Sequence, residues 1–213
     1  SGANKILLIY LPTGTDSWVT NSSNVQIINT LTDSEISELG FMTRAEIMDL
    51  SIQNPSSSWL LYGELNRYKH ISGEDFAPVY HYYASTIRSV DSGANILSPS
   101  ILNWDYTCVG CSSFTVCENK LVSGFVCGRE WIEDFLSEYL SLYGSYPDID
   151  TWIIDVYPLD WQNLPNSASH HLGISKNQIT NFRIYLDQIN RNGIDKYRNT
   201  PIWVMEFGLH VGY

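Results

Sequence analysis

The segment at residues 201–208 constrains the fold of this chain more than any other. It begins with a proline, continues through the apolar run Ile-Trp-Val-Met, and reaches Glu206 two residues before Gly208. Such a run is typical of a buried strand that is covered on both faces. A charge is unfavourable inside a strand of this kind, so we expect Glu206 at its carboxyl end, where the sheet meets solvent.

A second segment, at residues 59–66, follows the same pattern. The apolar residues Trp59, Leu60 and Leu61 are followed by a glycine-containing turn and Glu64. Parallel α/β folds build their sites at the carboxyl ends of the strands. The two segments therefore predict that Glu64 and Glu206 meet at one edge of a sheet. For either residue alone, the alternative is a solvated carboxylate at a strand end.

Strand-like and helix-like segments alternate along the chain. Strand-like runs occupy residues 5–10, 59–61, 94–100, 150–158 and 201–206. Apolar residues recur at helical spacing over 76–90, 131–140 and 179–189, and a capping-box sequence at Thr43 starts a further short helix. We expect the three longer helices to close at Gly93, Gly144 and the pair Asn192-Gly193. This alternation predicts right-handed crossovers and a parallel sheet.

Two parallel architectures compete, an open doubly wound sheet and a closed barrel. No glycine-rich phosphate turn follows any of the strand-like runs, which disfavours a nucleotide-binding doubly wound fold. A (β/α)8 TIM barrel normally needs about 250 residues. The five strand-like runs are too few for such a barrel, so a barrel over residues 1–213 would lack strands at both ends. Its open edges predict companion segments or chains.

Charge and composition restrict the partners. The chain has 12 Lys and Arg against 23 Asp and Glu, a formal charge of −11, which excludes nucleic acid and anionic membranes as expected partners. No apolar stretch of membrane-span length is present, so we expect no membrane insertion. The 7 Trp and 14 Tyr residues supply flat apolar faces with a polar edge, which suit stacking on sugar rings. These features favour a secreted or cell-surface protein that acts on carbohydrate.

A pair of carboxylates at facing strand ends is what glycoside hydrolysis requires, because one protonates the leaving oxygen while the other attacks the anomeric carbon. Three motifs extend this idea: Tyr-Gly-Glu-Leu-Asn at 62–66, Trp-Ile-Ile-Asp-Val-Tyr-Pro at 152–158 and Val-Met-Glu-Phe-Gly at 204–208. On these motifs the chain resembles the clan A retaining glycoside hydrolases with (β/α)8 barrels, and most closely the bacterial secreted Asl1-like glycosyl hydrolase domains. The resemblance covers nearly the whole chain. It implies that residues 1–213 are a single, incomplete (β/α)8 TIM-barrel domain, truncated at both ends, with strands three to seven present and strands one, two and eight absent.

The resemblance implies a role for several residues. Glu64 would be the general acid/base, Glu206 the nucleophile, and Tyr157 would hydrogen-bond and orient Glu206. Asn66 would steady the loop behind Glu64. The residues expected to face substrate are Asn66, Trp104, Asp105, Asp155, Trp161 and His210. For Trp104, Asp105 and Trp161 the alternative is packing or loop capping. Neither a cofactor nor a metal is implied.

Two positions depart from the pattern of that group. Gly63 stands where an Asn usually binds the substrate 2-hydroxyl, and Asp155 stands where a His is common and changes the charge around Glu206. Two hypotheses follow. The first is a retaining O-glycosyl hydrolase that cleaves a polysaccharide or oligosaccharide by double displacement. The alternative is a catalytically degenerate barrel that serves as a carbohydrate-binding or extracellular surface, matrix or filament component.

The remaining features concern processing and loops. Four cysteines lie in a loop excursion at residues 107–128, namely Cys108, Cys111, Cys117 and Cys127. Cys108 and Cys111 could form one zinc knuckle, but Cys117 and Cys127 are too far apart in the sequence for a second, so two disulfides are favoured over zinc. Four cysteines allow three pairings, of which Cys108–Cys111 with Cys117–Cys127 is our first choice. Asn21 begins the one N-glycosylation sequon, which matters only in a glycosylating pathway. The five histidines lack metal-ligand spacing, and His170 and His171 are expected in a polar loop.

Overall fold

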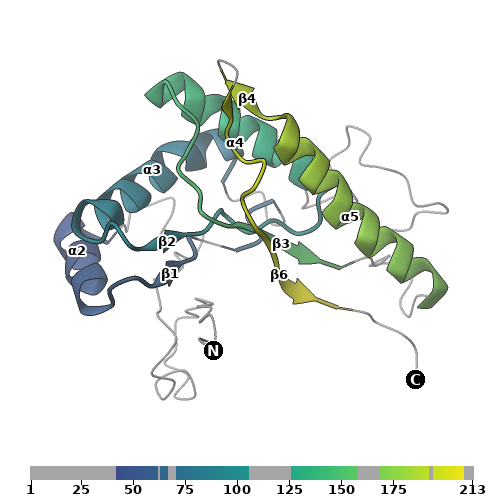
Figure 1. The fold of residues 1–213 in the computed structure, drawn as a ribbon, viewed down its shortest axis with the longest axis horizontal. Helices are drawn as coiled ribbons and strands as arrows, with labels where there is room; N and C mark the ends of the chain where they lie inside the picture. Colours follow the sequence, from purple (N-terminus) through teal and green to yellow (C-terminus); the bar gives the residue numbers. More distant parts are fainter. Residues whose placement is uncertain are drawn as a thin grey trace.

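The computed structural model describes residues 42–61, 63–66, 71–105, 126–157, 168–191 and 194–208. This part of the chain is a mixed α/β structure with four helices and short, mostly parallel strands (Figure 1). The helices are α2 (Arg44–Gln53), α3 (Gly73–Val90), α4 (Gly128–Tyr143) and α5 (Ala168–Gln188). The strands are β1 (Ser58–Trp59), β2 (Asn95–Ile96), β3 (Trp152–Val156), β4 (Asn190–Arg191), β5 (Ile194–Asp195) and β6 (Ile202–Phe207).

Four of these strands neighbour one another in chain order. β1 pairs in parallel with β2, and β3 pairs in parallel with β6. Parallel bridges from Leu97 to Thr151 and from Leu102 to Asp155 join residues 97–102, which follow β2, to β3 and the residue before it. The predicted parallel alternation of strands and helices is therefore confirmed for these segments. The described residues do not form a complete barrel, and the strand expected at residues 5–10 lies outside them.

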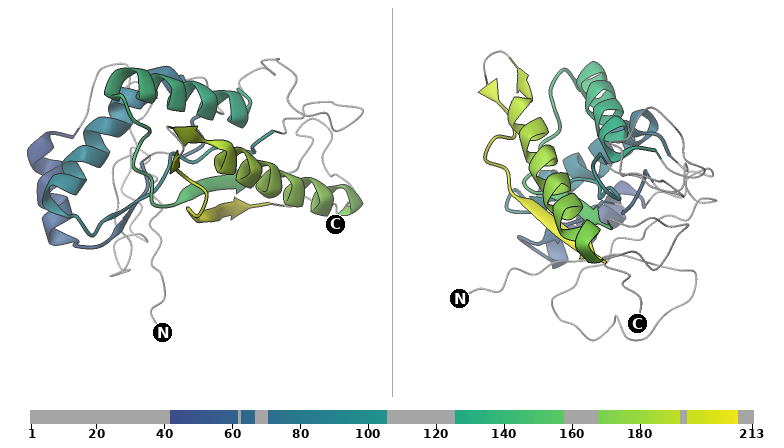
Figure 2. Two further views of the ribbon diagram at one scale, coloured as in Figure 1. Left: turned by 45° about the horizontal axis from the view of Figure 1, so that its top comes forward. Right: turned by 90° about the vertical axis from the view of Figure 1, so that its right-hand side faces the viewer.

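The main core lies between the strands and the helices α3, α4 and α5, which cover one side of the sheet (Figure 2). Aromatic rings dominate the contact of α3 with α4: the ring centroids of Tyr80 and Phe135 are 5.4 Å apart, and those of Phe76 and Trp131 are 5.8 Å apart. Phe182 of α5 packs edge-on against Trp152 of β3. Burial of these large apolar surfaces, at about 25 cal/mol per Å², is the main force that holds the helices on the sheet.

The opposite side, here called the inner face, carries a smaller apolar cluster. Along β3, Trp152, Ile154 and Val156 belong to the helix-side core, whereas Ile153 packs with Leu60 and Leu97. Trp203 and Met205 of β6 are partly buried against the same small cluster. Side chains alternate between the two faces of a strand, so Asp155 follows Ile153 onto the inner face.

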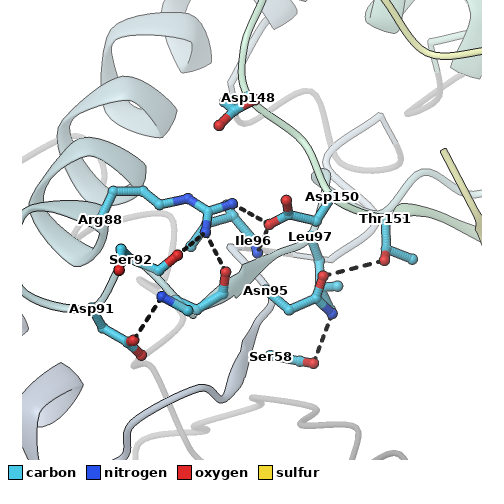
Figure 3. A network of polar contacts seen from close by, with 12 residues as sticks. Ser58, Arg88, Asp91, Ser92, Asn95, Ile96, Leu97, Asp148, Asp150 and Thr151 are labelled. Carbon is cyan, nitrogen blue, oxygen red and sulfur yellow. Dashed lines mark hydrogen bonds and ion pairs between the residues drawn. The ribbon is translucent and has the colours of Figure 1, made fainter.

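A polar network fastens the amino ends of the strands (Figure 3). The guanidinium of Arg88, at the end of α3, donates to the carbonyls of Ser92 and Ala94 and pairs with the carboxylate of Asp150. Asp150 also accepts the backbone N–H of Ile96 at 2.6 Å. The network ties α3 to the starts of β2 and β3, at the end of the sheet opposite to Glu206.

The local signals for helix ends had mixed outcomes. The capping box at Thr43 and the close of α4 at Gly144, whose φ is +69°, are confirmed. The expected end of the last helix was wrong: α5 stops at Gln188, because residues 190–191 instead pair antiparallel with residues 194–195. The histidines at 170 and 171, expected in a loop, lie within α5. None of the described helices is long and apolar enough to span a membrane.

The expectation that residues 201–206 form a strand covered on both faces was also wrong. The side chains of Val204 and Phe207 are 40% and 52% exposed. Among the strands that the structure describes, β6 pairs only with β3.

Asn66 joins three backbone segments behind the carboxyl ends of the strands. Its side-chain NH₂ donates to the carbonyls of Leu102 (2.8 Å) and Val126 (3.0 Å), and its side-chain oxygen accepts the N–H of Leu102 at 2.8 Å. The residue is 1% exposed. It therefore connects the loop after β1 to the β2 segment and to the approach to α4.

Replacing this amide should destabilise the fold. We expect Asn66→Ala to lower the free energy of unfolding by about 2–4 kcal/mol, because it leaves buried backbone groups without partners. Urea denaturation measures this, with Asn177→Ala, at an exposed position of α5, as the control that changes stability by less than about 1 kcal/mol. Equal effects of the two substitutions would show that the hydrogen bonds of Asn66 contribute little to stability.

Candidate active site

A β-bulge between β3 and β6 places Glu206 beside Asp155. The pairing runs Ile153 to Trp203 and Ile154 to Val204, and then skips Met205 so that Asp155 pairs with Glu206. Without the extra residue, Glu206 would lie on the opposite face from Asp155, because side chains alternate along a strand. Bulges are known to redirect a side chain in this way near functional sites. Two carboxylates from neighbouring strands therefore meet at the carboxyl end of the sheet.

Tyr157 holds the Glu206 carboxylate. Its hydroxyl donates a hydrogen bond of 2.7 Å to Glu206 Oε2, the contact that the sequence led us to expect. Burial raises the pKa of Tyr157, and the hydrogen bond to Glu206 and the charges of Glu206, Glu64 and Asp155 raise it further. The phenol is therefore a proton donor to Glu206 across the physiological pH range.

Gly208 lies directly against the ring of Tyr157. A Cβ atom at this position would be 2.2 Å from Tyr157 Cε1 and 2.5 Å from Cδ1. The backbone N–H of Gly208 donates to the carbonyl of Val156 at 3.3 Å, which continues the pairing of β6 with β3. A glycine is therefore required at position 208, because any Cβ atom there would collide with the tyrosine ring.

Glu64 lies close to the same group of residues. Its charge contributes to the raised pKa of both Asp155 and Tyr157, which puts its carboxylate within electrostatic range of both. The residue is 5% exposed, and its φ of +48° is in the left-handed region. A non-glycine residue in this conformation stores strain of about 1–3 kcal/mol, and such strain is concentrated at functional sites. Glu64, Asp155, Tyr157 and Glu206 thus form one cluster of electrostatically interacting residues.

Asp155 is a deeply buried carboxyl group of the cluster. It is 3% exposed and accepts a hydrogen bond from the hydroxyl of Ser100. Burial raises the pKa of Asp155 to about 7, and the charges of Glu206 and Glu64 add to the rise while the Ser100 hydrogen bond opposes it. Below this pH the Asp155 carboxyl is neutral, so the cluster carries one negative charge fewer.

Trp104 and Asp105 occupy the helix side of the sheet. The Trp104 ring is 2% exposed and stacks on Phe182 with the centroids 4.6 Å apart. Asp105 is 8% exposed and accepts from the side-chain NH₂ of Asn181 at 2.7 Å. Both residues line a groove of about 380 Å³ along α4 and α5 that includes none of the four residues of the cluster. Their surroundings are those of packing residues, and Asn66 is likewise engaged by backbone groups.

The other expected residues lie outside the described part of the chain: Asn21, Cys108, Cys111, Cys117, Trp161 and His210. Cys127 is described and is 6% exposed, with its Sγ 3.5 Å from the carbonyl oxygen of Trp104. Its three candidate disulfide partners are among the residues not described. Within the described residues, His, Cys, Asp and Glu side chains form no group of three or more that could hold a metal ion.

Sequence reasoning missed Ser100 and Asn103. Ser100 contacts Asp155, and Asn103 contacts the backbone of Tyr157. The available signal was their position, since both are polar residues at the carboxyl end of the strand expected at 94–100 or just after it. In comparisons of the chain with protein-family models, curated proteins and solved structures, nothing matched.

The raised pKa of Asp155 predicts a specific pH dependence of stability. The folded state holds a proton that the unfolded chain, with an Asp pKa of about 3.9, releases, so this group's contribution to stability is present at low pH and falls as the pH rises through about 4 to 7. We expect Asp155→Asn to abolish this fall. Between pH 4 and pH 8 the free energy of unfolding of the variant should therefore rise relative to that of wild type by up to about 4 kcal/mol.

Urea denaturation at several pH values measures the difference. Asp49→Asn, at an exposed position of α2, is the matched control. Its free energy of unfolding should differ from that of wild type by the same amount at every pH. A constant difference for Asp155→Asn as well would contradict the burial of a neutral carboxyl group.

The contact of Gly208 with Tyr157 predicts the effect of a single methyl group. Gly208→Ala should force the tyrosine ring away and break its hydrogen bond to Glu206, with a loss of stability of about 1–3 kcal/mol from overpacking. Gly173→Ala, at an exposed position of α5 with open space around it, is the control. A crystal structure of Gly208→Ala in which the 2.7 Å hydrogen bond persists would overturn this account.

Proposed function

We propose that this chain is a retaining glycoside hydrolase that cleaves a polysaccharide or oligosaccharide, with Glu206 as nucleophile and Glu64 as general acid/base. The observation that carries the proposal is the pairing of Asp155 with Glu206 at the carboxyl ends of the parallel strands β3 and β6, with Tyr157 hydrogen-bonded to Glu206 and the buried Glu64 near enough for its charge to act on Asp155. Paired carboxylates in such a place suit hydrolysis of a glycosidic bond.

The reaction would proceed in two displacements. A carboxylate oxygen of Glu206 attacks the anomeric carbon, the glycosidic C–O bond breaks, and the leaving oxygen takes the proton of Glu64. Glu64, now ionised, removes a proton from water, whose oxygen attacks the same carbon and displaces Glu206. The sugar leaves with its original anomeric configuration, and Glu64 is protonated again for the next cycle.

The surrounding residues suit these roles. The Tyr157 hydroxyl holds Glu206 Oε2 in place, which leaves the other oxygen available for attack. Reaction also requires Glu64 protonated while Glu206 is ionised. Below a pH of about 7 Asp155 is neutral, which removes one negative charge from the surroundings of both glutamates.

We also propose that the described strands are part of a (β/α)8 barrel. Four parallel strands that neighbour one another in chain order, with helices covering one side and a second apolar cluster on the other, are the expected arrangement for consecutive barrel strands. In this proposal the remaining strands come from segments outside the described residues or from companion chains. Secretion and disulfide bonding of the cysteine loop belong to the same proposal.

One observation favours the second candidate, a carbohydrate-binding barrel without turnover. A Cβ atom at Gly63 would meet nothing within 4 Å, so among the described residues no other group occupies the space where an asparagine side chain would begin. A bond to the substrate 2-hydroxyl supplies several kcal/mol in the transition state. A site without it could still hold sugar.

Substitution of the carboxylates separates the two candidates. On a panel of glycans, Glu64→Gln should lower kcat by about 10²–10⁴-fold, and Glu206→Gln should lower it at least as much, while Glu74→Gln at an exposed position of α3 retains activity. NMR of the first product should show a retained anomeric configuration. Wild type that binds glycans but is as inert as Glu206→Gln would establish the binding function instead.

A further inference from the structure

We infer that Asn103 is a positioning residue that fixes Tyr157 and, through its hydroxyl, the carboxylate of Glu206. The consequence for catalysis rests on the proposed function. The consequence for the geometry of Tyr157 and Glu206 does not, because it follows from contacts in the structure alone. Asn103 lies seven residues after β2 (Asn95–Ile96), Tyr157 directly follows β3, and Glu206 lies near the end of β6.

The side-chain amide of Asn103 makes a reciprocal pair of hydrogen bonds with the backbone of Tyr157. The Tyr157 N–H donates to Asn103 Oδ1 at 2.9 Å, and Asn103 Nδ2 donates to the Tyr157 carbonyl at 3.0 Å. Two residues before Tyr157, the two segments still pair through their backbones, since the Asn103 N–H donates to the Asp155 carbonyl at 2.8 Å. The amide therefore extends the ladder beyond the last backbone pair to the residue that holds Glu206.

Asn103 reaches this position in a left-handed backbone conformation. Its φ is +55°, a region that is uncommon for residues with a side chain and that asparagine adopts more readily than most of them. The residue is only 2% exposed. Glycine would adopt the same φ without strain. The amide group is thus the feature that glycine could not replace.

The helices hold this turn on two sides. The N–H groups of Trp104 and Asp105 both donate to Gln178 Oε1 of α5, at 2.6 and 3.0 Å. From α4, the Arg129 N–H donates to the Trp104 carbonyl at 2.7 Å. Gly128 approaches so closely that a Cβ atom there would be 2.0 Å from the Asn103 carbonyl oxygen. A strained residue persists only where its surroundings determine it in this way.

The contacts form a continuous path from the helices to Glu206. Helices α4 and α5 fix the turn, the turn presents the Asn103 amide, the amide fixes the Tyr157 backbone, and the Tyr157 hydroxyl holds Glu206. The ring of Tyr157 has Gly208 on one side, so it cannot compensate for a shifted backbone by moving in that direction. Loss of the amide should therefore displace the hydroxyl.

The test uses Asn103→Gly, which keeps the left-handed conformation and removes the amide. A crystal structure of the variant should show the Tyr157 hydroxyl displaced from Glu206, and the Tyr157 amide should exchange with solvent at least tenfold faster. The control is Asn199→Gly, at an exposed position, which should change neither. An unchanged hydrogen bond and exchange rate in Asn103→Gly would overturn the inference, whether or not the chain is an enzyme.

Kinetics tests the catalytic consequence on a substrate that wild type cleaves. Asn103→Gly should lower kcat about ten- to a hundredfold with little change in KM, since misplacement of a reacting group by about 1 Å can cost about a hundredfold. Asn103→Asp, which keeps the acceptor for the Tyr157 N–H, should recover part of the loss. In a Tyr157→Phe background Asn103→Gly should have no further effect.

Additive effects of Asn103→Gly and Tyr157→Phe would overturn the inference, because they would show that Asn103 does not act through the tyrosine. If wild type cleaves no glycan, the proposed function fails while the crystal structure and the exchange rate still decide the role of Asn103. Should Asn103→Gly fail to fold, the same structure and exchange measurements on Asn103→Asp, which is expected to show a smaller displacement, decide it instead.

Discussion

The pairing of β3 with β6 is the contact on which the candidate site depends. Because the strands are parallel, their carboxyl ends lie at one edge, and the extra residue at Met205 turns Glu206 to the side of Asp155. Trp203 and Met205 meanwhile stay on the inner apolar cluster, so the bulge changes the direction of the carboxylate without exposing the strand's inner side chains. Tyr157 and Gly208, the next residues of each strand, then complete the surroundings of Glu206.

The two ends of the sheet have different properties. At the amino end, Arg88 and Asp150 satisfy backbone groups and tie α3 to β2 and β3. At the carboxyl end, a buried Asp155 and two residues with left-handed backbones, Glu64 and Asn103, are each unfavourable for folding. The aromatic core under the helices and the network at the amino end offset this cost. Such a division is usual in parallel α/β folds, where the amino ends of the strands serve stability and the carboxyl ends serve function.

Local patterns in the sequence predicted much of the fold, and contacts between distant residues account for what it did not predict. Helical spacing and the capping box at Thr43 depend on neighbours a few residues away, so they could be read directly. A charge after an apolar run placed Glu64 and Glu206 at strand ends. A one-residue bulge leaves no such pattern, and the Asn103–Tyr157 bond joins residues 54 positions apart. Nor could composition show that Trp104 packs on Phe182 or that Phe207 is exposed.

We propose that Glu206 becomes covalently bound to the sugar during turnover. Incubation of the protein with slow fluorinated glycosides of the sugars it cleaves, followed by peptide mass spectrometry, would locate this adduct. We expect one glycosyl group per chain, attached to the peptide that contains Glu206 and absent after Glu206→Gln. Hydrolysis without any adduct and with inverted configuration, or an adduct on a different carboxylate, would contradict it.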